Sequence, residues 1–197
     1  MTIVGVLALQ GDVPEHEVAF AKLVGPTNVV RVRTPAELAK VDAITLPGGE
    51  STAISHLLDR TGLRMPLRER VARGLPVLAT CAGLIVLAQR LEPVPGGRNP
   101  VSLRVLDVGV RRNDFGRQRE SFEAPVRVEG VAEEFPGVFI RAPRILEVGP
   151  HAQAFAWRGD DVVGVRSGAI WGVSFHPELS RDPRIAQAFL RDTTRRR

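Results

Sequence analysis

Cysteine is nearly absent from this chain, because Cys81 is the only one among its 197 residues. A lone cysteine excludes an internal disulfide framework and a zinc site built on several thiolates. Long hydrophobic runs are missing as well: the apolar opening at residues 3–9 is too short to cross a bilayer, and no basic leader precedes it. We therefore expect a cytoplasmic protein with no membrane partner, no metal and no cofactor.

A concentrated basic surface is also missing from the sequence. Lys and Arg number 27 against 22 Asp and Glu, which gives a formal net charge of +5. The arginines are scattered and cluster only at residues 195–197, so we expect no nucleic acid partner and interpret residues 191–197 as a frayed basic tail. No repeat or linker interrupts the chain, so we expect a single domain over residues 1–197.

Apolar segments and helical segments alternate in the first half of the chain, which predicts a parallel α/β sheet. Short strands at close spacing follow, and they predict antiparallel additions to that sheet. The expected fold class is therefore α/β, a flavodoxin-like mixed sheet flanked by helices. Strands are expected at 3–9, 28–32, 43–46, 76–79, 103–110, 122–128, 138–141, 152–157, 162–166 and 169–175, and helices at 15–23, 34–37, 51–60, 64–73, 84–91 and 183–190.

The lone cysteine lies where a predicted strand turns into a predicted helix. Such an elbow raises one side chain above the sheet and requires small neighbours, which Ala79 and Gly83 provide. A helix N-terminus behind Cys81 favours the reactive thiolate. A buried, inert cysteine is the common alternative, and this segment alone leaves both interpretations open.

A cysteine nucleophile needs a base, and His176 is the best placed of the four histidines. Pro177 favours an extended conformation for His176, and residues i and i+2 of an extended chain share a face. Glu178 should therefore orient the imidazole. His16 and His56 fall in predicted helices as packed or surface residues, and His151 falls in a loop.

Three predicted strand ends are followed by unusual loops. One contains Gln10 and Gly11, the second contains residues 48–50, and the third contains Cys81. Carboxyl ends of parallel strands meet at one edge, so we expect these loops to form one crevice. Gly48 and Gly49 allow the backbone to aim N–H groups at an oxyanion, together with the N–H of Ala82. A turn that caps a helix through Ser51 is the simpler reading, and both can hold.

The segment TCAG at 80–83, followed by FHPE at 175–178, resembles the class I (triad) glutamine amidotransferases. Further motifs narrow the resemblance to the glutaminase subunits of pyridoxal 5′-phosphate synthase, the PdxT family, over about residues 3–190. Several of them are long, occur in order and are not shared by the other amidotransferases. These motifs are LQGD at 9–12, LPGGEST at 46–52, RNDFGRQ at 112–118, SFE at 121–123, FIRAP at 139–143 and FHPEL at 175–179.

This resemblance implies hydrolysis of L-glutamine to L-glutamate and ammonia, which passes to a separate synthase subunit in a hetero-oligomer. It implies that Cys81 is the nucleophile, His176 the base and Glu178 its partner. Ala79 stands where the family usually has glycine, which tightens the elbow. The resemblance further assigns the substrate site to Gly48, Gly49, Glu50, Ser51, Arg112, Ile140 and Arg141, and the oxyanion hole to Gly49, Ala82 and Gln10.

Three alternatives remain at this level. A glutaminase that serves histidine or nucleotide synthesis would share the triad but lack the motifs at 112–118 and 139–143. A protease or chaperone with a cysteine elbow would have a histidine directly after the cysteine, where this chain has Ala82. A non-enzymatic binding module gives no reason for Cys81, His176 and Glu178 to occur together.

Overall fold

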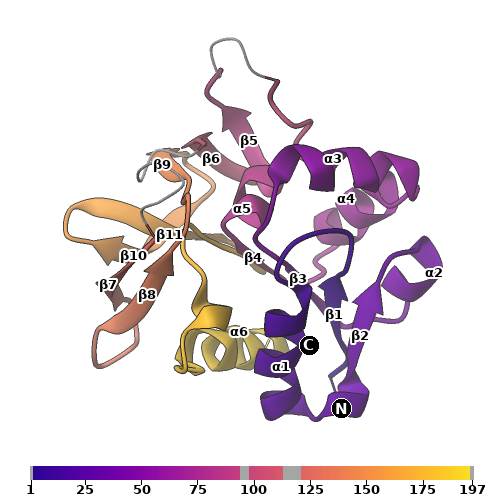
Figure 1. Ribbon diagram of the computed structural model, residues 1–197, viewed down its shortest axis with the longest axis horizontal. Helices are drawn as coiled ribbons and strands as arrows, with labels where there is room; N and C mark the ends of the chain where they lie inside the picture. Colours follow the sequence, from indigo (N-terminus) through magenta and orange to yellow (C-terminus); the bar gives the residue numbers. More distant parts are fainter. Residues whose placement is uncertain (1, 94–97, 113–120, 196–197) are drawn as a thin grey trace.

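A twisted mixed sheet forms the centre of the computed structural model, which describes residues 2–93, 98–112 and 121–195 (Figure 1). The first strands of the chain are parallel to one another, and β12 joins them in parallel next to β4. The remaining strands add in antiparallel fashion, which confirms the expected fold class. In spatial order the strands are β2 (Val29–Val32), β1 (Val4–Leu7), β3 (Ala43–Leu46), β4 (Val77–Thr80), β12 (Ile170–Val173), β11 (Asp161–Ser167), β10 (Gln153–Arg158), β7 (Phe122–Val128) and β8 (Phe135–Phe139).

Helices cover the two faces of this sheet and bury two large apolar clusters. Successive residues of a strand face opposite sides, so on β4 Val77 joins one cluster and Leu78 the other. The cluster around Val77 packs against α3, α4 and α5, and that around Leu78 packs against α1 and α6. The helices are α1 (Val13–Val24), η1 (Pro26–Asn28), α2 (Pro35–Leu38), α3 (Ser51–Arg60), α4 (Arg64–Ala72), α5 (Ala82–Leu87), η2 (Pro177–Leu179) and α6 (Arg184–Arg195).

A small second sheet lies beside α5, and the sequence did not predict it. It contains β5 (Ala88–Leu91), β6 (Leu106–Arg111) and β9 (Arg144–Val148), with β5 parallel to β6. The helix expected over 84–91 is therefore wrong in its second half. A short apolar run fits a helix or a buried strand equally well, and here pairing with β6 decides.

The start of α2 follows a local capping signal, whereas the end of α6 depends on tertiary packing. The sequence Thr-Pro-Ala-Glu at 34–37 predicts a capping box, and it is present. The Thr34 side chain accepts from the N–H of Glu37, and the Glu37 side chain accepts from the N–H of Thr34. Helix α6 continues to Arg195, five residues past its expected end, and buries Thr193. Residues 191–195 of the expected tail are thus helical, and 196–197 lie outside the described residues.

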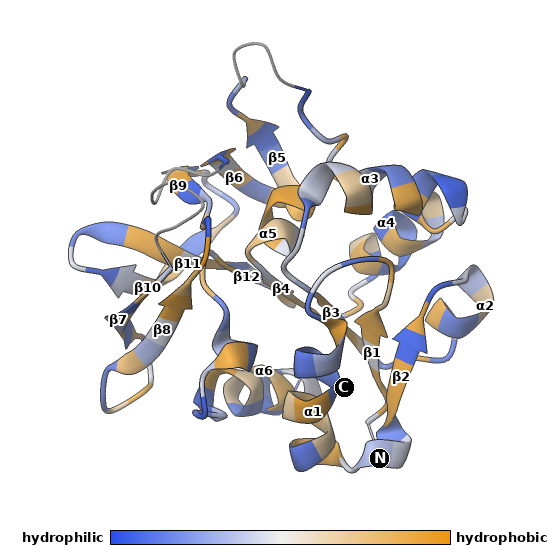
Figure 2. Ribbon diagram, viewed as in Figure 1, coloured by the Kyte–Doolittle hydropathy of each residue, from blue (hydrophilic) through white to orange (hydrophobic). Residues whose placement is uncertain are grey.

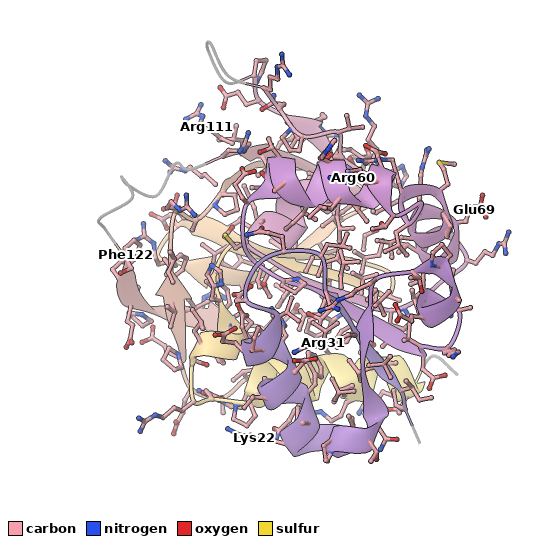
Figure 3. All side chains as sticks on the ribbon, turned by 45° about the vertical axis from the view of Figure 1, so that its right-hand side comes forward. Lys22, Arg31, Arg60, Glu69, Arg111 and Phe122 are labelled. Carbon is pink, nitrogen blue, oxygen red and sulfur yellow. The ribbon has the colours of Figure 1, made fainter. Side chains whose placement is uncertain are left out.

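Polar and charged side chains are spread around the molecule. In Figure 2 the strands β1 and β3 are coloured hydrophobic, whereas α2 and α4 carry hydrophilic stretches. In Figure 3 the labelled Lys22, Glu69 and Arg111 lie on different sides of the molecule. Within the described segments, no helix combines the length and apolar character that a bilayer crossing requires.

Helix α1 provides a matched test of burial, because helical spacing over residues 15–23 predicts that both Val18 and Phe20 face the core. Phe20 is 1% exposed and meets Phe189 edge to face, whereas Val18 is 56% exposed. We predict that Phe20→Ala lowers the free energy of unfolding by about 3–5 kcal/mol. Val18→Ala should change it by less than about 0.5 kcal/mol. Urea denaturation measures both, and equal losses would contradict the packing of α1 described above.

Candidate active site

The turn from β4 into α5 takes place at Cys81. This residue has φ 47° and ψ −103°, a left-handed conformation that is strained for any residue except glycine. Its N–H donates to the carbonyl oxygen of Val173 at 2.9 Å, which ties the turn to β12. A Cβ at Gly83 would overlap the carbonyl oxygen of Leu46. The elbow thus requires a small residue two positions after Cys81, as the sequence indicated.

His176 follows β12 and reaches the same edge of the sheet. Its N–H donates to the carbonyl oxygen of Val138 at 2.8 Å, and its ring is buried. Nδ1 lies 2.7 Å from Oε1 of Glu178, so the expected pair forms. The local geometry differs from the expectation: after Pro177 the chain enters η2, a 3₁₀ turn, and the carboxyl group reaches back along this turn and not along an extended strand.

A second carboxyl group, which the sequence analysis missed, also contacts His176. Oδ2 of Asp12 lies 2.9 Å from Nδ1 of His176, the same nitrogen that Glu178 contacts. Asp12 is the residue before α1, where an aspartate usually caps the helix, but its side chain makes no capping hydrogen bond. The available signal was its position directly after Gln10 and Gly11 at a strand end.

These contacts shift the pKa values of the three groups His176, Glu178 and Asp12. Burial alone would lower the pKa of His176, but its interactions with Asp12, Cys81 and Glu178 raise it to about 12. Burial raises the pKa of Glu178 to about 8, although the hydrogen bond with His176 opposes this change. Burial would also raise the pKa of Asp12, yet hydrogen bonds with His176 and Glu178 hold it well below its ordinary value. Asp12 is thus the permanently charged partner of the imidazolium at neutral pH.

The thiol and the imidazole are electrostatically coupled but do not form a hydrogen bond here. Sγ of Cys81 donates to the carbonyl oxygen of Ile140 at 3.7 Å. Nε2 of His176 is buried and has no hydrogen-bond partner among the described residues. The thiol and the imidazole therefore lie in the same site, and the thiol must rotate away from Ile140 before the two can pair.

A cavity of about 330 Å³ opens in front of Cys81 and His176. Gly48 lies beside the imidazole, where a Cβ would overlap the ring, and Glu178 lies behind it. The motif at 112–118 falls outside the described residues except for Arg112. The predicted residues that line the cavity are Gly49, Glu50, Ser51, Cys81, Ala82, Arg112, Ile140, Arg141 and His176.

Glu50 organises the polar wall of this cavity. Its Oε1 accepts from Arg112 at 3.0 Å, and its Oε2 accepts from the N–H of Ala53 at 2.8 Å. Glu50 is therefore the N-cap of α3, whereas Ser51 was the residue expected to cap this helix. Burial would raise the pKa of Glu50, but bonds from Thr52 and Ala53 and the charge of Arg112 lower it. Glu50 and Arg112 present one charge of each sign.

Two loops from different strand ends pack backbone against backbone. Oε1 of Gln10 accepts from the N–H of Glu50 at 2.7 Å, and the N–H of Asp12 donates to the carbonyl oxygen of Gly48 at 3.3 Å. A Cβ at Gly11, whose φ is 108°, would overlap that same carbonyl oxygen. Only glycine permits this approach. The expected convergence of the strand-end loops is thus confirmed.

One group of side chains could in principle hold a metal ion. Asp12, His16 and Glu178 offer donor atoms that lie within 4.8 Å of one another. Both carboxyl groups already contact His176, and the ring nitrogens of His16 contact hydroxyl groups. Hydrogen bonding accounts for this cluster, so its geometry alone gives no reason to place an ion there.

Residues 6–195 match the model of the SNO glutamine amidotransferase family. Two curated archaeal proteins named pyridoxal 5′-phosphate synthase subunit PdxT are similar over nearly their whole length. The one from Pyrococcus horikoshii is 50% identical, covering 95% of this chain and 97% of its own; the one from Thermococcus onnurineus is 47% identical, with 97% and 98% covered. A solved structure described as a glutamine amidotransferase superposes with a TM-score of 0.89 at 44% identity, covering 98% of this chain and 99% of its own.

The coupling between Cys81 and His176 can be measured as thiol reactivity. An imidazolium next to a thiol favours the thiolate, which is the form that iodoacetamide alkylates. We predict that His176→Ala slows alkylation of Cys81 by about tenfold or more at pH 7. His56→Ala, which changes an exposed histidine on α3, should leave the rate unchanged. Equal rates in the wild type and His176→Ala would show that this imidazole does not act on the thiol.

Proposed function

Because the chain belongs to the SNO glutamine amidotransferase family, we propose that it hydrolyses L-glutamine with Cys81 as the nucleophile. The observation that carries this proposal is the shared cavity of Cys81 and His176, with the imidazole held from behind by Glu178. Asp12 contacts the same imidazole nitrogen and keeps the ring cationic. A thiolate beside an imidazolium is both nucleophile and proton donor, as amide cleavage requires.

The proposed reaction uses the residues of the cavity in two half-reactions. The Cys81 thiolate attacks the side-chain carbonyl carbon of glutamine, and N–H groups at Gly49 and Ala82 stabilise the oxyanion. Nε2–H of His176 protonates the departing nitrogen, so the C–N bond breaks and ammonia leaves. A water molecule then gives a proton to the neutral imidazole and attacks the thioester. The C–S bond breaks, and glutamate and the free thiol are released.

The charged wall of the cavity suits an α-amino acid. We assign the substrate ammonium group to Glu50 and the carboxylate to Arg112 and Arg141. Arg112 is 13% exposed at its side chain and already paired with Glu50, so substrate takes over an existing ion pair. Arg141 is exposed at the rim and has φ 45°. Ser51 and Ile140 would border the side chain of glutamine, and Gln10 would support the oxyanion loop through Glu50.

The proposal includes a partner. The relatives are named as subunits of pyridoxal 5′-phosphate synthase, so we propose that this chain delivers its ammonia to a synthase subunit in that pathway, in the cytoplasm. The relatives therefore favour this synthase over the histidine and nucleotide enzymes considered from the sequence. The Cys81 thiol is hydrogen-bonded to the carbonyl oxygen of Ile140, and Nε2 of His176 has no hydrogen-bond partner among the described residues. Because the two groups do not pair, these contacts support a resting state that the partner activates.

The nucleophile is tested by Cys81→Ala. Alanine fits the elbow and has the same left-handed strain as cysteine, so circular dichroism and Tm should match the wild type. Ammonia release from glutamine should fall by about 10³-fold or more, because the covalent intermediate cannot form. Val18→Ala serves as a control with an intact site. Wild-type ammonia release by Cys81→Ala would remove Cys81 from the mechanism.

Partner activation is tested by steady-state glutamine hydrolysis with and without the synthase subunit. Turnover should rise by the factor by which the competent state becomes more populated, and about tenfold or more is expected if that state is the minor one. Iodoacetamide labelling of Cys81 should accelerate in parallel, because both need the thiol released from Ile140. Identical turnover with and without the synthase would contradict activation and leave the triad assignment intact.

A further inference from the structure

A chain of buried polar side chains lies behind the catalytic histidine, and the mechanism above does not use it. Its centre is His16 on α1, which is 1% exposed. Nδ1 of His16 lies 3.0 Å from Oγ1 of Thr45 on β3, and Nε2 lies 3.2 Å from Oγ1 of Thr80 on β4. Both threonines are fully buried. Three polar side chains from three elements therefore meet inside the core, on the side of the sheet that α1 covers.

The ring of His16 also reaches the catalytic carboxyl group. Its Nε2 lies 3.5 Å from Oε2 of Glu178, whose other oxygen contacts His176. That Oε2 atom is buried and has no hydrogen-bond partner within the described residues. A buried carboxyl oxygen without a partner is costly. Nε2 of His16 approaches it at 3.5 Å and lies nearer to Thr80, at 3.2 Å, so its one proton is shared between the two oxygens.

We infer that His16 is a positioning residue for glutamine hydrolysis: its Nε2–H holds Oε2 of Glu178, so that Oε1 faces Nδ1 of His176. The inference rests on the proposed function, since it concerns the same reaction. The matching tautomer has the Thr45 hydroxyl donating to Nδ1 of His16, which leaves the proton on Nε2. Orienting groups behind a functional histidine commonly fix its tautomer and ring position in this way.

The charges around this contact favour a neutral donor. Burial lowers the pKa of His16 to about 4, despite the opposing charge of Asp12, so the ring is uncharged at neutral pH. The charged groups that face Glu178 are His176 and Asp12. Lys22, Arg181 and Asp182 line, together with His16 and Glu178, a small cavity of about 80 Å³. A neutral N–H satisfies Glu178 without adding a second cation beside His176.

This arrangement predicts a pH effect with a definite sign. A hydrogen bond to the ionised form lowers a carboxyl pKa, so loss of the His16 donor raises that of Glu178 further above its ordinary value. The ionised form of Glu178 is a stronger acceptor for the Nδ1–H of His176 than the protonated form, whose carbonyl oxygen accepts more weakly. The ascending limb of kcat/KM against pH therefore moves to higher pH when the donor is lost. A histidine that only fills space would not move this limb.

The test compares two polar replacements of similar size in the complex with the synthase subunit. His16→Gln carries an amide N–H that reaches the Nε2 position, whereas His16→Asn is one methylene shorter and loses that reach. We expect His16→Asn to lower kcat by about tenfold and to move the ascending limb up by about one pH unit. His16→Gln should stay within about threefold of the wild type, with the limb unmoved. KM for glutamine should not change, because His16 does not line the substrate cavity.

A double-mutant cycle identifies the route of the effect. If His16 acts through Glu178, His16→Asn should cost almost nothing in a Glu178→Gln background. An equal loss in both backgrounds, or an unmoved pH limb in His16→Asn, overturns the inference. Should His16→Asn fail to fold, Thr45→Val replaces it: this nearly isosteric change removes the hydroxyl at Nδ1 and should move the limb in the same direction, and an unmoved limb overturns the inference. Absence of glutamine hydrolysis in the wild-type complex would instead contradict the proposed function.

Discussion

The candidate site depends on one steric constraint: β4 must become α5 within a single residue. The positive-φ conformation of Cys81 costs about 1–3 kcal/mol. The surroundings hold it in place through the hydrogen bond to Val173 and the close contact of Gly83 with Leu46. Strand β4 lies between β3 and β12. The same turn therefore brings the thiol next to the glycine loop after β3 and to His176 after β12.

Much of this arrangement could be predicted from the sequence because its signals are local. The capping box at Thr34, the strand of Ala43–Leu46 and the small residue after Cys81 are short-range steric and hydrogen-bonding features, and each was found at its expected place. The pairing of His176 with Glu178 was also predicted, although the prediction assumed an extended chain where the structure has a 3₁₀ turn. Side chains two residues apart lie close together both in an extended chain and in a 3₁₀ turn, so the contact was predicted correctly from an incorrect backbone conformation.

The features that the sequence did not predict depend on contacts between distant segments. Asp12 and His176 are 164 positions apart, and His16 and Thr80 are 64 apart. No periodicity relates such residues; only the sheet order brings them together. The same holds for β5, whose residues were expected to continue a helix but form a strand because they pair with β6. Val18 was wrongly expected in the core because helical spacing locates an apolar stripe less accurately than the packing of α1 does.

The edge strand β8 has features that oppose edge-to-edge pairing with another molecule. Pro125 and Pro136 stand opposite each other in β7 and β8, and since neither has an N–H, they occupy a non-hydrogen-bonded pair whose donor positions point outward. The open edge of β8 thus lacks a donor at Pro136. Two residues on, the carbonyl oxygen of Val138 is taken by the N–H of His176. Two successive outward-facing positions of β8 therefore cannot pair with the strand of another molecule, so the segment that holds His176 also protects this sheet edge against self-association.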